Sequence, residues 1–264
     1  MSRLLTAGVA VPLLLAILLL GPDWLFFALA LIVAALGYWE LGALMKSSGQ
    51  DLLGAGFLTV LLVTSAFYFE PLTLTHATLA SILVIGGAVV FQWSPSRDRL
   101  AGAMGTFFAT FYVGALMGSI VALRTLGPEP AGRHWVIFLL AVVFVGDAGA
   151  YYSGRSLGRH ALAPRLSPKK TVEGLVGGIV ASIATSVALV EFWFPELETS
   201  TAIGLGLMLG LLGVIGDLFE SFLKRSAGVK DTSALIPGHG GILDRIDSVL
   251  FAGPALLLYL LWIA

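Results

Sequence analysis

The stretch SFLKRSAGVKDTSALIPGHGGILDRID (residues 221–247) is a dense polar segment in a chain that is otherwise almost entirely apolar. Ten ionisable side chains lie between Asp217 and Asp247 when His239 is counted. Charged groups are costly to place in hydrocarbon, and those that are present usually serve a function. The stretch therefore predicts a working site, and the apolar segments on both sides of it predict the membrane helices that carry this site.

The composition of the chain is that of an integral membrane protein. Hydrophobic residues make up 58% of its 264 residues and charged residues only 12%, and apolar runs of about twenty residues, long enough to cross a bilayer, recur from end to end. The fold class expected is all-α, a polytopic membrane helix bundle with about nine transmembrane helices. The chain has no cysteine, which excludes thiolate chemistry, disulfides and a cysteine zinc site. The expected spans lie near residues 3–20, 24–45, 52–69, 76–92, 100–124, 134–152, 172–194, 201–223 and 242–263.

These spans use nearly the whole chain, so residues 1–264 are expected to form a single membrane domain. Within it, residues 1–130 supply N-terminal transmembrane helices, and residues 131–264 supply the C-terminal helices and cytoplasmic loops with the expected site. The first apolar run has the length of a signal peptide but lacks a convincing small-residue cleavage site before Gly21. It is therefore expected to remain uncleaved as a membrane span.

The basic residues are distributed unevenly over the two sides that nine spans imply. Of the fifteen Lys and Arg residues, thirteen fall on the side of the N-terminus, and only Arg124 and Arg133 fall on the other. Lys and Arg are enriched in cytoplasmic loops, so the N-terminus is predicted to be cytoplasmic and the C-terminus non-cytoplasmic. Loops 153–171 and 224–241 then share the cytoplasmic side of the cytoplasmic (inner) membrane. A site built from both would meet soluble anionic substrates and the lipid headgroups of the inner leaflet.

Two acidic helix faces flank the glycine-rich loop of the polar segment. In each of them, carboxylates three residues apart share one face of a helix. Oxygen donors from two neighbouring helices suit a hard cation such as Mg²⁺, which keeps several waters or phosphate oxygens among its ligands. The alternative is a set of buried ion pairs with Arg225 or Arg245 that hold the helices in register. The end of the eighth span carries Asp217, Glu220, Ser221 and Lys224, and the start of the ninth carries Asp244 and Asp247.

Three further segments are suited to binding phosphate. The glycines of loop 238–241 can bring backbone amides close to an anion. Asp147 in the sixth span is followed by Arg155 and Arg159, which at i and i+4 are expected on one helix face with forked donors for phosphate. Residues 167–174 are interpreted as a basic helix start whose N-terminal dipole favours anions. The alternative for these bases is the ordinary enrichment of cytoplasmic loops in positive charge.

Other polar or small residues have simpler interpretations. Glu40 and Glu191 are lone carboxylates with no partner visible in the sequence. We expect them to be packing or interfacial residues, with one half of a proton relay as the alternative. The glycines at three- and four-residue spacing in the eighth span are expected to let helices approach closely, within a monomer or in a dimer. These glycines are Gly206, Gly210, Gly213 and Gly216. The histidines His76, His134 and His160 have no metal-ligand spacing and are assigned no role.

The pattern Ser221-x2-Lys-Arg-x4-Lys-Asp-x5-Pro-Gly-His-Gly-Gly-x2-Asp-Arg-x-Asp247 resembles the signature of the phosphatidate cytidylyltransferase (CDP-diglyceride synthase) family. Segments 147–159 and 167–174 also resemble segments of that family, whereas residues 1–130 match only as generic hydrophobic helices. The resemblance implies transfer of CMP from CTP to phosphatidic acid, which gives CDP-diacylglycerol and pyrophosphate in phospholipid biosynthesis. It also implies a requirement for Mg²⁺ and leaves a second cation open.

The resemblance and the residue chemistry together imply roles for individual side chains. The nucleophile of such a reaction is an anionic phosphate oxygen, so the main task is to bring two polyanions together and to stabilise the leaving pyrophosphate. The expected metal ligands are Asp217 and Asp244, supported by Glu220, Asp247 and Asp147. The expected catalytic residues are Asp217, Asp244, Lys224, Lys230, Asp231, His239 and Arg245. The expected substrate-binding residues are Ser167, Lys169, Lys170, Ser221, Arg225, Gly240, Gly241 and Arg155.

The expected partners are CTP, phosphatidic acid and membrane lipids, without nucleic acid, and the glycine faces are compatible with a homodimer. Two other functions stay open. One is a different metal-dependent membrane transferase that acts on a lipid phosphate, such as a polyprenyl phosphate. The other is an ion-coupled transporter, which would be expected to carry paired motifs in corresponding halves and charges near the bilayer midplane. The sequence shows no such pairing.

Overall fold

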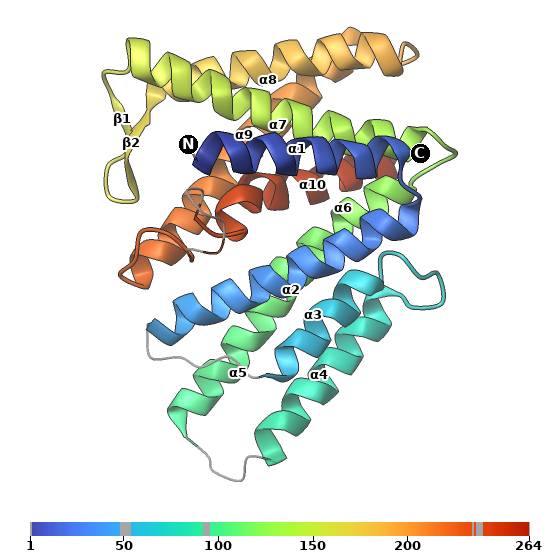
Figure 1. The fold of residues 1–264 in the computed structure, drawn as a ribbon, viewed down its shortest axis with the longest axis vertical. Helices are drawn as coiled ribbons and strands as arrows, with labels where there is room; N and C mark the ends of the chain where they lie inside the picture. The colour runs from blue at the N-terminus through green and yellow to red at the C-terminus, as the bar shows by residue number, and fades with distance from the viewer. Residues whose placement is uncertain (1, 48–53, 92–95, 234, 236–239, 264) are drawn as a thin grey trace. The chain divides into compact units, whose positions relative to one another are not determined.

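The computed structural model describes residues 2–47, 54–91, 96–233, 235 and 240–263, and most of them are helical (Figure 1). Helices are expected because backbone groups in a lipid environment must find their hydrogen-bond partners within the segment. The elements in chain order are α1 (Ser2–Leu20), α2 (Asp23–Ser47), α3 (Ala55–Ser65), α4 (Leu74–Phe91), α5 (Arg97–Ala109), the π-helical turn η1 (Thr110–Ala115), α6 (Leu116–Thr125), α7 (Ala131–Leu157), β1 (Ala161–Ala163), β2 (Ser167–Thr171), α8 (Val172–Trp193), α9 (Thr199–Ser226) and α10 (Leu243–Ile263).

The chain is a polytopic α-helical membrane protein. Within the described residues, seven helical segments are long and apolar enough to cross a membrane: α2, α4, the continuous run from α5 to α6, α7, α8, α9 and α10. They coincide with seven of the expected spans. The expected spans 3–20 and 52–69 coincide with α1 and with the 11-residue α3, although residues 52 and 53 lie outside the described part. The count of nine spans and the orientation of the termini stay predictions.

The chain divides into two compact units. The first comprises Met1–Leu126 and Leu223–Arg245, and the second comprises Gly127–Phe222 and Ile246–Ala264. The end of α9 and the start of α10 therefore belong to the first unit, and the remainder of both helices belongs to the second. This division into units does not test the expected single membrane domain of residues 1–264, which stays a prediction.

In the first unit, α3 packs against α2, α4 and η1 through small and hydroxylated side chains. The hydroxyls of Thr59 and Thr110 lie 2.7 Å apart, both fully buried. An ion pair joins the first residue of α2 to the last turn of α6, where Arg124 contacts Asp23 at 2.6 Å. Only 2% of the arginine is exposed. The guanidinium also donates to the Gly21 carbonyl at 3.4 Å. This pair, in which the arginine is buried and the aspartate is partly exposed, joins the start of α2 to the end of α6.

In the second unit, α7 and α8 pack closely along glycine and serine positions. A Cβ at Gly149 would lie 2.6 Å from the Ala181 Cβ. The buried Ser182 hydroxyl donates to the Val142 carbonyl at 3.1 Å, which joins α8 to α7. The Ser186 hydroxyl donates to the Ala202 carbonyl at 2.6 Å, which joins α8 to α9. Small residues of this kind let helix backbones approach where apolar side chains would hold them apart.

A short hairpin departs from the expected fold. Ser167–Thr171 was expected at the start of a helix, but it forms β2 and pairs antiparallel with β1. Pro168 favours extended backbone at the residue before it. The helix begins only at Val172, where the Thr171 hydroxyl accepts from the Gly174 N–H at 3.1 Å as an N-cap. Figure 1 shows the hairpin between the ends of α7 and α8.

The expectation that glycines in α9 permit close helix approach is confirmed at Gly206, Gly210 and Gly216, whereas a Cβ at Gly213 would make only ordinary contacts at 3.7 Å. A Cβ at Gly206 would lie 2.6 Å from the Ile183 Cα, and one at Gly216 would collide with the Asp247 carbonyl. Both contacts are within the chain, so these glycines are already used in the monomer. The homodimer stays a prediction that they do not support.

Adding one methyl group at two glycines of α9 tests this packing. We expect Gly206→Ala to destabilise the protein by about 1–3 kcal/mol, because the new Cβ meets backbone that cannot rotate away. The matched control is Gly204→Ala on the same helix, where nothing lies within 4 Å of the new Cβ. This control is expected to be neutral or stabilising by up to about 1 kcal/mol, because alanine favours helix. Unfolding in detergent measures both, and equal stability of the two variants would contradict the packing argument.

Candidate active site

The first group of polar residues is centred on Asp244 at the start of α10. The Lys224 ammonium from the end of α9 contacts its Oδ1 at 2.6 Å. Its Oδ2 accepts from the Gly241 N–H at 2.8 Å, from the Thr232 N–H at 3.1 Å and from the Thr232 hydroxyl at 2.9 Å. Both side chains of the ion pair are largely buried, with 11% of Lys224 and 7% of Asp244 exposed. Asp244 therefore fixes the lysine and folds the preceding loop onto its own helix.

The bond from Gly241 to Asp244 spans three residues and corresponds to one half of a capping box, in which a side chain in the first turn reaches back to a free backbone N–H. Glycine is required at two positions here. Gly240 has φ +80°, a left-handed conformation that other residues rarely adopt. A Cβ at Gly241 would collide with the Thr232 hydroxyl and lie 2.6 Å from both Glu40 carboxylate oxygens.

Glu40 on α2 is a member of this group, which corrects its interpretation as a lone packing or interfacial carboxylate. It is fully buried. Its Oε1 accepts from the Ser233 hydroxyl at 2.6 Å and the Ile242 N–H at 2.8 Å. Its Oε2 accepts from the Leu243 N–H at 2.8 Å and lies 3.2 Å from the Thr232 hydroxyl. Glu40, Thr232 and Ser233 belong to this candidate site but were missed by sequence reasoning, because the partners of Glu40 lie about two hundred positions away from it.

The second group lies in the second unit and is centred on Asp217 of α9. The Lys170 ammonium from β2 contacts its Oδ2 at 2.6 Å. The Ser221 hydroxyl, one turn further along α9, lies 3.5 Å from its Oδ1. Asp147 on α7 and Asp247 on α10 are both close enough to Asp217 to interact with it electrostatically. Three helices and one strand thus bring three of the predicted carboxylates and one predicted lysine together.

Two further residues complete this second group. Glu220 on α9 is fully buried, and its carboxyl lies within hydrogen-bonding reach of Asp247. The Ser248 N–H donates to the Asp247 Oδ1 at 2.6 Å, and the Ser248 side chain bonds Asp147. Two carboxyl groups at such a distance need a shared proton or a nearby cation, because like charges repel strongly where water is scarce.

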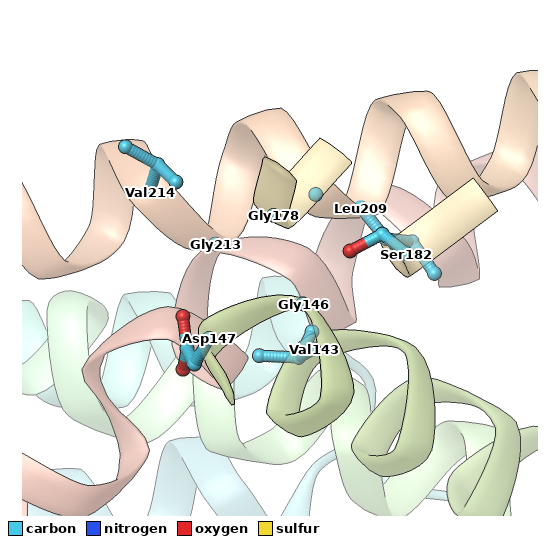
Figure 2. A pocket seen from close by; sticks show the side chains of 9 residues that line it. Val143, Gly146, Asp147, Gly178, Ser182, Leu209, Gly213 and Val214 are labelled. Atoms are coloured by element: carbon cyan, nitrogen blue, oxygen red, sulfur yellow. The ribbon is translucent and has the colours of Figure 1, made fainter. Parts of the chain in front are cut away.

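A small cavity adjoins Asp147 in the second unit (Figure 2). Its walls come from α7, α8 and α9, and they include Val143, Ser182 and Val214. The space open to the centre of a water molecule is about 10 Å³, enough for about one water. The cavity can hydrate the Asp147 carboxyl, and it is too small for a nucleotide or a lipid headgroup.

Other predicted site residues are placed elsewhere or outside the description. Arg155 and Arg159 do not share a helix face, because α7 ends at Leu157. The Arg159 N–H instead donates to the Glu173 carboxylate at 3.0 Å, and the Arg155 guanidinium donates to the Tyr151 hydroxyl at 3.0 Å. His239 lies outside the described residues. Exposed side chains on the described part of the chain include Lys169, Arg225, Lys230, Asp231 and Arg245, while Ser167 is half-buried.

One carboxylate of each group pairs with a lysine, Asp217 with Lys170 and Asp244 with Lys224. Among the described residues, no three acidic or histidine side chains converge closely enough to hold a metal ion by themselves. Mg²⁺ does not need three, because it is commonly held by one or two carboxylates together with waters and substrate phosphates. The oxygen donors of the second group fit such an ion in kind and in charge.

The fold and these two groups define a class: a polytopic helical membrane protein in which each of two compact units holds a group of carboxylates with a lysine. The family model of the Cytidylyltransferase family matches residues 1–263. The chain belongs to this family.

Curated relatives that match most of the chain include three enzymes named phosphatidate cytidylyltransferase. The protein from Synechocystis sp. is 31% identical over 96% of this chain and 94% of its own length. The protein from Brucella suis is 36% identical over 91% of this chain and 84% of its own. The protein from Staphylococcus aureus is 33% identical over 96% of both chains. The likeness therefore extends through residues 1–130, which resembled the family only as generic helices in the sequence.

Replacement of one lysine tests the first group. We expect Lys224→Met to destabilise the protein by about 3 kcal/mol, because it leaves the largely buried Asp244 carboxylate without its cation. Arg225→Met is the matched control, since Arg225 is the neighbouring base on the same helix and is exposed. Its effect should stay within about 0.5 kcal/mol. Unfolding in detergent measures both variants, and equal losses would show that Lys224 is not held as described.

Proposed function

We propose that this protein transfers CMP from CTP to phosphatidic acid, giving CDP-diacylglycerol and pyrophosphate in phospholipid biosynthesis. The observation that carries the proposal is the similarity, over more than nine-tenths of the chain, to enzymes named phosphatidate cytidylyltransferase. The two polar groups supply the side chains that such a reaction needs. The substrates of this reaction are CTP and phosphatidic acid. The product CDP-diacylglycerol stays in the lipid phase, and pyrophosphate leaves into water.

The reaction joins a phosphate oxygen of phosphatidic acid to the α-phosphorus of CTP and breaks the bond from that phosphorus to the oxygen bridging to the β-phosphate. The attacking oxygen is anionic near neutral pH, so the enzyme has no need of a strong general base. The barrier comes from bringing two polyanions together and from charge that develops on the leaving pyrophosphate. Fixed ammonium groups at defined positions lower both costs.

Lys224 and Lys170 are bases that the structure holds in defined positions. The Lys224 ammonium contacts the Asp244 carboxylate, and the Lys170 ammonium contacts the Asp217 carboxylate. A bound phosphate would be a further acceptor for these ammonium groups. An anchored lysine also loses little side-chain freedom when the substrate arrives. The exposed bases Lys169, Arg225, Lys230 and Arg245 would add attraction for the triphosphate from the surface.

The remaining predicted site residues take supporting roles in this proposal. Ser167 and Ser221 offer hydroxyl donors, and Gly240 and Gly241 stay predicted phosphate contacts, although the Gly241 N–H already donates to Asp244. Asp231 and Arg155 would orient neighbouring groups. For His239 a phosphate contact and a loop-shaping hydrogen bond both stay open.

A magnesium requirement is part of the proposal. Asp217, Asp147 and Asp247 would hold the ion with Glu220 beside them, and Asp244 stays a predicted ligand whose two oxygens already accept from protein donors. When bound, the ion would neutralise charge on the phosphates of CTP and on the departing pyrophosphate. The protein's own part is to gather the carboxylates, which Lys170 and the Ser248 N–H help to keep in place. A second cation stays open.

The proposed topology has nine spans, with α1 and α3 added to the seven long apolar helical segments. The N-terminus is then cytoplasmic and the C-terminus non-cytoplasmic, in the cytoplasmic (inner) membrane. The distribution of Lys and Arg supports this orientation. It places Lys170 and Lys224 on the cytoplasmic side, where CTP is available.

The activity is tested with purified protein in detergent. We expect phosphatidic acid and labelled CTP to give CDP-diacylglycerol only with Mg²⁺, and Asp217→Asn and Asp244→Asn to lower turnover at least 100-fold, because each removes a charge that holds a lysine and that a cation would use. Glu70→Gln is the control, because it removes an exposed carboxylate that lies far in sequence from Asp217 and Asp244. Its turnover should match that of wild type.

Two results would contradict the proposal. A well-folded protein that makes no product from several phosphatidic acids, but uses a polyprenyl phosphate, would point to a different membrane transferase. Unchanged turnover and magnesium dependence of Asp217→Asn and Asp244→Asn would refute the residue assignment while leaving the reaction intact.

The orientation is tested by fusing a reporter after Ala264. We expect a reporter that is active only outside the cytoplasm to be active there, because nine spans place the two ends of the chain on opposite sides. A fusion of the same reporter after Lys170 is the control and should be silent. Activity after Lys170 with silence after Ala264 would overturn the orientation, and the same result at both positions would overturn the count of spans between them.

A further inference from the structure

Glu40 is the buried carboxylate that the proposed chemistry does not use. It lies on α2, far in sequence from the polar segment, and none of its surface is exposed. A carboxylate removed from water loses several kcal/mol of hydration. The protein compensates with short hydrogen bonds to both oxygens from residues 232–233 and 242–243. Such a set of donors is costly to assemble for a residue that only fills space.

Two of these donors are backbone N–H groups at the start of α10. Ile242 and Leu243 donate to the two oxygens of Glu40 at 2.8 Å each. The first N–H groups of a helix have no partner within the helix, and the helix dipole favours a negative charge beside them. Glu40 therefore acts as an N-terminal cap for α10 that is supplied by a different helix.

The Thr232 hydroxyl connects Glu40 to the centre of the first group. It lies 2.9 Å from the Asp244 Oδ2 and 3.2 Å from the Glu40 Oε2. A hydroxyl has one proton, so it donates to one carboxylate at a time, and the shorter distance favours Asp244. Gly241 fills the remaining space, since any Cβ there would collide with Thr232 and press on both Glu40 oxygens. The position of Asp244 thus depends on Glu40 through Thr232, through Gly241 and through the start of α10.

We propose that Glu40 is a positioning residue for the cytidylyl transfer reaction: it caps α10 and holds Thr232 and Ser233 so that Asp244 can anchor Lys224 in its working position. The inference rests on the proposed function. Glu40 is fully buried and acts through Asp244 and Lys224 rather than on the substrate. The N-terminal half of the chain thereby contributes to the site through one residue of α2.

Isosteric variants separate this role from a purely structural one. Glu40→Gln keeps the size of the side chain and removes its charge, and Thr232→Val removes the hydroxyl that touches Asp244 while Thr232→Ser keeps it. The matched control is Asp23→Asn on the other end of the same helix, which removes the carboxylate that pairs with the buried Arg124. This control disturbs a buried charge in the same unit but touches no residue of the first group.

The first readout is kcat and KM for CTP and for phosphatidic acid, measured well below the unfolding temperature of every variant. We expect Glu40→Gln and Thr232→Val to lower kcat/KM at least tenfold, Thr232→Ser to recover most of the loss, and Asp23→Asn to lower stability with kcat/KM within about twofold of wild type. Wild-type kcat/KM in both Glu40→Gln and Thr232→Val would overturn the proposal. A loss in Asp23→Asn equal to that in Glu40→Gln would also overturn it, because general instability would then explain both.

The second readout does not depend on activity. Amide hydrogen exchange of the peptide that contains Ile242 and Leu243 should be at least tenfold faster in Glu40→Gln than in wild type, and unchanged in Asp23→Asn. If the wild-type protein makes no CDP-diacylglycerol, the proposed function fails, and this comparison still decides whether Glu40 holds the start of α10. Equal exchange in wild type and Glu40→Gln would refute the positioning role whatever the activity.

Discussion

A carboxylate buried in an apolar helix bundle must receive its hydrogen bonds and counter-charge from the chain itself, and much of the polar architecture here follows from that requirement. Glu40 receives donors from Ser233, Ile242 and Leu243, and Asp244 receives an ammonium, two backbone N–H groups and the Thr232 hydroxyl. Meeting these demands folds residues 232–233 and 241–243 onto two helices. The loop conformation is therefore set mainly by the acids on the helices, because apolar contacts alone would leave its backbone polar groups unpaired.

Close helix packing is the second condition for the site, because it decides which carboxylates can meet. Gly216 allows the backbone of α9 to touch the Asp247 carbonyl of α10. Asp217, the next residue, is thereby placed within electrostatic range of Asp247. Gly146 on α7 lies against α8 instead, where a Cβ would collide with the Ser182 hydroxyl. On α9, the glycine directly before Asp217 thus brings the helix close enough for this acid to join the group.

The sequence predicted the parts of this structure that depend on local pattern. Long apolar runs between Gly and Pro breakers predicted the helices to within a few residues. The spacing of Asp244 and Asp247 at i and i+3 did not predict that these two acids join different groups. Sequence reasoning failed where the outcome depended on a competing local interaction. Arg159 leaves the helix face because Glu173 captures the backbone N–H groups of Arg159 and His160 just after α7 ends, and the hairpin before α8 forms at Pro168. Glu40 could not be assigned at all, since only the tertiary fold brings its donors to α2.

The two polar groups differ in charge, and that difference bears on where a cation would bind. In the first group, Asp244 is balanced by Lys224, and the charge of Glu40 is balanced by the start of α10 and by hydroxyl donors. The second group contains four acids, at Asp147, Asp217, Glu220 and Asp247, against one ammonium, Lys170. If all were ionised, their formal sum would be −4 + 1 = −3, which is unfavourable in a medium of low dielectric constant unless protons or cations are bound. A divalent cation would relieve that repulsion in the second group, whereas in the first it would have to displace donors that Asp244 already has. The arrangement of donors therefore favours Asp217 and its neighbours as the cation-binding acids and Asp244 as the anchor of Lys224.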